Sequence, residues 1–260
     1  MKNKDLKHGD FSALAKDYSK YRPHYSHSVL NTIVKLMDRP SNDLTMVDVG
    51  AGTGIWTRML AETGCSNVVA VEPNDNMREC GQEDSSGFNI RWIEGHGAHT
   101  KLPENTADLV TMASAFHWVD FDQATKEFAR ILVPNGRFAA LWNPRLLIAN
   151  PLLVEIEETL HEMAPMIERV SSGCSGFTEN LMDRLQNSPY FTDVLFIEGR
   201  HVQRQTPEEY IGVWRSVNDI QVQAGSKIFE KFIAYVEKRV RHLDHVEATY
   251  QTRAWTAVKS

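Results

Sequence analysis

A glycine-rich loop is the part of the sequence whose residue types and spacing most clearly imply chemistry. It reads Val-Asp-Val-Gly-Ala-Gly-Thr-Gly over residues 47–54 and closes an apolar run. Glycines after a strand let the backbone turn sharply and let a ligand approach it closely. In α/β sheets the carboxyl end of a strand is where nucleotides bind. The loop therefore predicts a nucleotide-type binding site.

The spacing within the loop selects among nucleotide classes. A dinucleotide fingerprint needs a small third residue, and Ile55 followed by Trp56 occupies that place. A Walker loop needs Gly-Lys-Ser/Thr, which does not follow. A G-x-G-x-G loop preceded by Asp48 suits S-adenosylmethionine (SAM), whose methionine end is small and carries no phosphate.

A carboxylate stands where a nucleotide ribose would be held. Glu72 ends the next apolar run, 20 residues after Gly52, and can accept hydrogen bonds from both ribose hydroxyls. Pro73 and Asn74 come next, and Met77 either lies on the adenine or packs in the core. Glu72 by itself does not separate SAM from NAD.

Candidate groups for the reaction follow the later strands. If the ligand is SAM, the reaction would be a methyl transfer, an in-line displacement to which an enzyme contributes mainly alignment and desolvation. A general base is needed only for a protonated acceptor, and His117, just past the predicted strand at 107–113, is the candidate. Aromatic faces attract a sulfonium. The aromatic residues available for this are Tyr18, Tyr21, Phe116, Trp118 and Trp142.

Further residues are placed where a substrate could lie. Trp142 and Asn143 end the predicted strand at 137–142 and are expected to border the substrate. Tyr210 and Trp214 are four residues apart, so they share one helix face. They either wall the pocket or pack against the sheet.

These residues need a scaffold, and the chain predicts one. Apolar strands that alternate with helices imply a parallel sheet covered on both faces, a doubly wound α/β architecture. The predicted strands lie at 44–49, 67–71, 90–93, 107–113 and 137–142. The helices between them are predicted at 55–63, 75–81 and 121–132.

The second half is predicted to complete the same domain. It contains helical stretches, a Ser/Gly-rich loop at 171–176, and strands at 194–197 and 248–258. We expect a single domain over 1–260. Its parts are N-terminal lid helices at 1–43, a binding core at 44–143, a cap insertion at 144–190, and C-terminal strands and helices at 191–260.

Composition narrows the class of partner. The 260 residues carry a net charge of −6, so no general basic field attracts nucleic acid. No apolar stretch approaches the roughly 18 residues of a membrane span. The three cysteines form no CxxC pair, which favours a reducing cytoplasm without a metal site. We expect a small-molecule substrate, no nucleic-acid or membrane partner, and a monomer or homodimer.

Together these motifs resemble a known family. The loop at 48–54, Glu72, the run at 108–113 and Phe116-His117-Trp118 resemble class I SAM-dependent methyltransferases. The segments Tyr-x-x-Tyr-Arg-Pro-x-Tyr at 18–25, 95–103 and 214–216 are similar to the small-molecule "type 11" group, which includes trans-aconitate-methyltransferase-like enzymes. The resemblance spans nearly the whole chain. It implies a Rossmann-like, mostly parallel seven-stranded sheet with an antiparallel last strand and a helical cap.

The resemblance also implies roles for individual residues. The cofactor would be SAM and the product S-adenosyl-L-homocysteine, with Arg22 binding the methionine carboxylate and Glu72 the ribose. Where family members often have an acidic residue, this chain has Ala98, so backbone groups there are expected to border adenine. The implied cofactor contacts are Tyr21, Arg22, Asp48, Gly50, Ala51, Gly52, Gly54, Glu72, Pro73, Met77, Gly97, Ala98, Ser114 and Phe116. The expected substrate contacts are Tyr18, His117, Trp142, Asn143, Tyr210 and Trp214.

Two other functions fit part of the pattern. A SAM-binding protein could use such a site for a reaction without methyl transfer or for sensing a ligand. A nucleotide-dependent oxidoreductase is disfavoured by Ile55.

Overall fold

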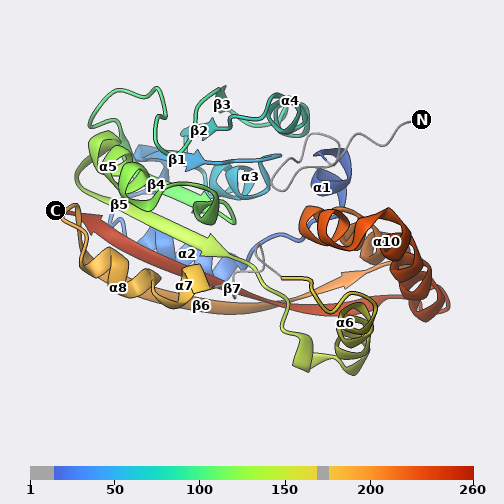
Figure 1. The fold of residues 1–260 in the computed structure, drawn as a ribbon. Helices are drawn as coiled ribbons and strands as arrows, with labels where there is room; N and C mark the ends of the chain where they lie inside the picture. The colour runs from blue at the N-terminus through green and yellow to red at the C-terminus, as the bar shows by residue number, and fades with distance from the viewer. Residues whose placement is uncertain (1–14, 169–175) are drawn as a thin grey trace.

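The computed structural model describes residues 15–168 and 176–260, and its centre is a seven-stranded sheet in the order β3-β2-β1-β4-β5-β7-β6 (Figure 1). Strands β1 to β5 pair in parallel, and β7 runs antiparallel to both β5 and β6. This is the predicted Rossmann-like arrangement with an antiparallel last strand. The strands are β1 (Thr45–Val49), β2 (Asn67–Val71), β3 (Ile90–Ile93), β4 (Ala107–Ala113), β5 (Leu132–Trp142), β6 (Phe191–Gln205) and β7 (Val246–Lys259).

Helices cover both faces of the sheet because the buried strands are apolar on both sides. In β1, Met46 joins one core cluster and Val47 the other, as the alternation of side chains along a strand requires. The first cluster is closed by α2 (His27–Lys35) and α3 (Ile55–Glu62). The second is closed by α5 (Phe121–Ile131) and α8 (Leu181–Gln186).

A third cluster forms a helical cap beside the sheet. Its helices are α6 (Pro151–Met163), α9 (Pro207–Arg215) and α10 (Asn218–Val240), which pack with the first residues of β7. Figure 1 shows α6 and α10 gathered at that end of the long β7 strand. Within α10 the helix is broken at Gly225, whose φ is 71°.

The remaining helices are short or lie at the edge of the sheet. They are α1 (Ala15–Tyr21), α4 (Asp75–Asp84) and α7 (Gly176–Glu179). Among the described residues, no helix combines the length and the apolar character that crossing a bilayer requires.

The expected strands at 67–71, 90–93 and 107–113 are reproduced in full. Two strands are much longer than the sequence predicted. β5 begins at Leu132, because residues 132–136 remain in the strand through an irregular stretch opposite β4 instead of ending the preceding helix. β6 spans 15 residues instead of 194–197, since its outward positions are polar and half-exposed and weaken the apolar signal. The expected loop at 171–176 lies outside the described residues except for Gly176, which begins α7.

Candidate cofactor and substrate site

The glycine loop turns at the carboxyl end of β1, where the strand order reverses between β2 and β4. Gly50, Gly52 and Gly54 have φ values of 68°, 57° and 78°, in the left-handed region that favours glycine. A Cβ on Gly50 would stand 2.7 Å from that of Ala115. The loop therefore needs glycine both for its turn and for its close contact with the residues after β4.

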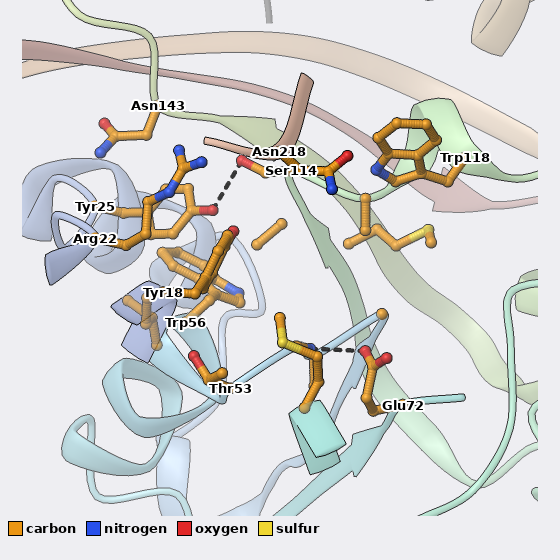
Figure 2. Close-up of a pocket in the computed structure, with 18 of the residues that line it drawn as sticks. Tyr18, Arg22, Tyr25, Thr53, Trp56, Glu72, Ser114, Trp118, Asn143 and Asn218 are labelled. Atoms are coloured by element: carbon orange, nitrogen blue, oxygen red, sulfur yellow. Dashed lines mark hydrogen bonds between the residues drawn. The ribbon is translucent and has the colours of Figure 1, made fainter. Parts of the chain in front are cut away.

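Glu72 is held in place by the backbone on both of its oxygens. The Gly52 N–H donates to Oε2 at 2.8 Å, and the Asn74 N–H donates to Oε1 at 2.9 Å. Burial raises the pKa of Glu72 above its ordinary value, and the two backbone donors oppose that shift. Figure 2 shows the carboxylate beside the glycine loop on the wall of the pocket.

A cavity of about 530 Å³ opens over this loop, a size typical of small-molecule sites. It brings together eleven residues expected at the site. Those expected for the cofactor are Arg22, Gly50, Ala51, Gly52, Glu72, Pro73, Met77, Gly97 and Ser114, and those expected for the substrate are Tyr18 and Asn143.

The segment before α2 closes one side of the cavity. Figure 2 shows Arg22 and Tyr25 facing Ser114 from this segment, on the side away from Glu72. The Arg22 guanidinium lies 4.8 Å from the Tyr18 ring centroid and donates through Nη2 to the Ser216 carbonyl at 3.2 Å. Its Nε is buried and has no hydrogen-bond acceptor within the described part of the chain. A ligand carboxylate could fill that place.

Asp48 does not line the cavity, contrary to expectation. Its carboxyl is fully buried and accepts hydrogen bonds from Thr57 Oγ1 at 2.6 Å and Thr111 Oγ1 at 3.1 Å. Burial raises its pKa from 3.8 to about 7. Asp48 therefore stabilises the base of the loop, because its hydrogen bonds link β1 to α3 and to β4.

Four other expected cofactor residues lie outside the lining. Tyr21 packs its ring on Gly212 of α9, where a Cβ would come within 2.4 Å of the ring. Gly54 faces the Trp92 ring. Ala98 donates its backbone N–H to His96 Nδ1 at 3.3 Å, so that donor is already used. Phe116 is wholly buried among aromatic rings of the core.

His117 and Trp142 interact with each other instead of facing the cavity. Trp142 Nε1 donates to His117 Nδ1 at 3.2 Å. Trp142 is 1% exposed and packs edge-on against Trp255, so it belongs to the core. Neither side chain is among the cavity-lining residues. The expected base, His117, is thus a half-buried side chain bonded to a core tryptophan, and the structure does not place either residue on the cavity wall.

Tyr210 and Trp214 also belong to the core. Both are fully buried in the cap cluster, where Trp214 packs edge-on against Phe232. The same helix instead lines the cavity through Val213, and Val217 follows it. The helical spacing identified the right helix, but the face toward the cavity is one residue away.

Several lining residues were not assigned a site role from the sequence. Tyr25 stood in the N-terminal motif, and Trp118 was a possible aromatic contact. Others carried no local signal because the strands and helices that bring them together are distant in sequence. The main additions are Tyr25, Trp56, His96, Trp118, Asn218 and Tyr250.

The residues of the cavity fit SAM. The glycines expose backbone, Glu72 presents a fixed carboxylate for ribose hydroxyls, and Met77 adds an apolar contact. The unpaired Nε of Arg22 offers a charge-assisted contact to a carboxylate. The described residues that line the cavity include neither a cluster of basic side chains nor a Walker loop for a polyphosphate.

Comparison with known proteins agrees with this site. Residues 47–140, which include the end of β1, the glycine loop and β4, match the family described as "Methyltransferase domain". An uncharacterized methyltransferase of Mycobacterium tuberculosis is 33% identical over 135 residues, covering 52% of each chain. An uncharacterized methyltransferase of Schizosaccharomyces pombe is 22% identical over 254 residues, covering 94% of each chain. The chain thus spans about half the length of the first of these relatives.

Solved structures share the fold. A chain from Anaeromyxobacter dehalogenans proposed to be a type II methyltransferase superposes with a TM-score of 0.68 at 17% identity, covering 92% of this chain and 98% of that one. Phosphoethanolamine N-methyltransferase 2 of Haemonchus contortus, solved with phosphomonomethylethanolamine and S-adenosylhomocysteine, gives 0.55 at 14% identity, covering 95% and 57%. At these identities the likeness concerns the fold.

Fold and site together define an α/β protein with a nucleotide-type pocket at the switch point of its sheet. The match of residues 47–140 to the methyltransferase domain supports a class I SAM-dependent methyltransferase, with S-adenosylmethionine as its cofactor.

Proposed function

We propose that this chain transfers a methyl group from SAM to a small-molecule acceptor in the cytoplasm. One observation carries the proposal: residues expected to contact the cofactor and residues of the cap line the same cavity. Glu72 and the glycine loop wall one part of it. Val213, Asn218 and Tyr250 come from the cap and β7 and leave room for a second molecule.

The methyl group of SAM is already activated because it is bound to a sulfonium. The chain's own residues therefore need chiefly to align the acceptor with this methyl group and to exclude water from both. Tyr25 and Trp56 pack edge-on at 5.3 Å between ring centroids beside the end of β4, and both line the cavity. Their rings exclude water and offer π-electron faces to a cation. Burial raises the pKa of Tyr25, so its hydroxyl stays protonated and can orient a partner but not accept a proton.

The test is to incubate the full chain with methyl-labelled SAM and a fractionated small-molecule extract. We expect S-adenosylhomocysteine to form together with a labelled small product, whose mass identifies the acceptor. Binding of SAM without S-adenosylhomocysteine from any fraction would favour a non-methylating role. Label found only in protein or nucleic acid would reject the small-molecule assignment.

A further inference from the structure

Arg145 is a buried cation on the wall of the cavity. It follows β5, and its side chain is only 9% exposed. Its guanidinium lies 4.0 Å from the ring centroid of Trp214, and its backbone forms an isolated bridge to Tyr250. These contacts fix the guanidinium between the cap and β7. Burying such a charge is costly unless it meets an opposite charge or hydrogen-bond acceptors.

Other residues of the protein meet the charge and the hydrogen-bond donors of Arg145 only in part. Nη2 lies 3.6 Å from Glu157 Oε2, which offsets the charge. The buried Nη1 has no acceptor within hydrogen-bond distance in the described part of the chain. A guanidinium has five donor hydrogens, and buried donors are rarely left without a partner.

A phenol beside Arg145 shares this shortage of acceptors. The hydroxyl of Tyr250 is buried and has no hydrogen-bond partner among the described residues, whereas the hydroxyl of Tyr210 interacts with Trp214 and Arg145. Burial raises the pKa of both groups, so both remain protonated. Tyr250 itself lines the cavity, and Tyr210 lies in the core of the cap. A single part of the cavity wall therefore holds a cation and a phenol that both lack an acceptor.

We propose that Arg145 and Tyr250 form a subsite for a carboxylate group of the substrate. The inference rests on the proposed function, in which Arg22 is engaged by the carboxylate of the methionine portion. Arg145 is then a second cation of the cavity, free for an anion on the other molecule. Its Nη1 and the Tyr250 hydroxyl would donate to the substrate's oxygens.

The charges at the subsite favour a carboxylate over a phosphate. Glu157 partly offsets the positive charge of Arg145, so a ligand group with one negative charge meets less repulsion there than a group with two. Among the described residues that line the cavity, Arg22 is the only Lys or Arg besides Arg145, so nothing more would offset the repulsion between Glu157 and a phosphate dianion. Arg145, Glu157 and Tyr250 all lie outside residues 47–140, so the part matched by the family does not determine this subsite.

The experiment measures binding of propionate, glutarate and citrate to the full chain by calorimetry, with and without saturating S-adenosylhomocysteine. Glutaramide and inorganic phosphate serve as comparison probes. We expect at least one carboxylate to bind with roughly millimolar affinity, while glutaramide and phosphate bind more weakly. Arg145→Gln should weaken that carboxylate by about tenfold or more, and Tyr250→Phe by about fivefold. The affinity for S-adenosylhomocysteine should stay within about twofold of the unchanged protein.

Arg241→Gln is the matched control, because this arginine also pairs with a glutamate but is 77% exposed on the cap. It should leave carboxylate binding unchanged. If Arg145→Gln fails to fold, the pair Arg145→Gln with Glu157→Gln keeps the charge balance, and Tyr250→Phe removes only a hydroxyl.

Three results would overturn the subsite: no binding by any of the three carboxylates, binding that these variants leave unaltered, or tighter binding of phosphate. Failure of the proposed function looks different. In that case the full chain forms no S-adenosylhomocysteine from SAM with any extract fraction, whereas carboxylate binding still depends on Arg145 in the protein alone.

Discussion

The hydroxyl of Tyr25 lies 2.9 Å from Oγ of Ser114, which joins the segment before α2 to the end of β4 (Figure 2). Ser114 has a φ of 52°, a conformation that non-glycine residues adopt only where their surroundings hold them in it. One residue further on, the Ser26 N–H donates to Thr252 Oγ1 of β7 at 2.8 Å. The N-terminal segment is therefore fastened to two strands beside the cavity.

Replacing Tyr25 with Phe should weaken cofactor binding while leaving the fold intact. The ring still packs on Trp56, but the hydrogen bond to Ser114 is lost. A net contribution of about 1 kcal/mol predicts a Kd for S-adenosylhomocysteine roughly fivefold higher. Calorimetric titration measures it. Tyr235→Phe is the control, since it removes a hydroxyl bonded to Glu155 in the cap. Equal affinities in both variants would show that the contact does not order the site.

The substitution Glu72→Gln should reduce cofactor affinity more strongly. Both carboxylate oxygens accept from backbone N–H groups, so an amide nitrogen placed on either side would face a donor. We expect the Kd for S-adenosylhomocysteine to rise at least about tenfold. Glu83→Gln, on the exposed side of α4, provides the comparison and should bind as the unchanged protein does. A Glu72 variant of normal affinity would remove Glu72 from the binding site.

A methyl group at Gly50 should damage both the fold and the site. Alanine there must adopt a φ of 68°, and its Cβ would lie 2.7 Å from that of Ala115. We expect the free energy of unfolding to fall by about 1–3 kcal/mol, and cofactor binding to be lost. Thermal unfolding and titration report the two effects. Gly87→Ala has open space around its Cβ, and its melting temperature should be nearly unchanged.

Stability should depend on pH through Asp48. Burial raises its pKa from 3.8 to about 7, so the folded state holds a proton that the unfolded state releases. The neutral carboxyl therefore supports the fold at low pH, and this support is lost as the pH rises from about 4 to about 7. Between pH 5 and pH 8, Asp48→Asn should gain about 2 kcal/mol of unfolding free energy relative to the unchanged protein. Denaturant titrations at both pH values give that difference, and a constant difference would contradict the raised pKa.

Much of the scaffold could be predicted because it is encoded locally. Strands β2 and β4 are short runs of mostly buried apolar residues, and β3 is a short, mainly apolar run that is partly exposed; such runs can be recognised from the sequence alone. β6 was underestimated because an edge strand is half-exposed and alternates in polarity. The short helices α7 and α8 were missed because six residues or fewer show too little periodicity.

The aromatic residues show where sequence patterns stop being informative. Phe116, Trp142, Tyr210 and Trp214 stand at the expected ends and faces of their elements, yet all four side chains are buried in cores. Large rings lower the free energy of the fold wherever they leave water, so their type does not distinguish a core from a binding wall. That choice depends on which helix packs on the other side.

The sequence alone determined the cofactor half of the site. The glycine loop and Glu72 each follow directly on a strand, and these strands, β1 and β2, are neighbours in the sheet. Local spacing therefore brings Gly52 and Glu72 into direct hydrogen-bond contact. Only the tertiary structure decided the substrate half. Arg145 and Tyr250 are 105 residues apart and meet because β7 returns antiparallel beside β5. Such pairing depends on long-range packing, which no local pattern records.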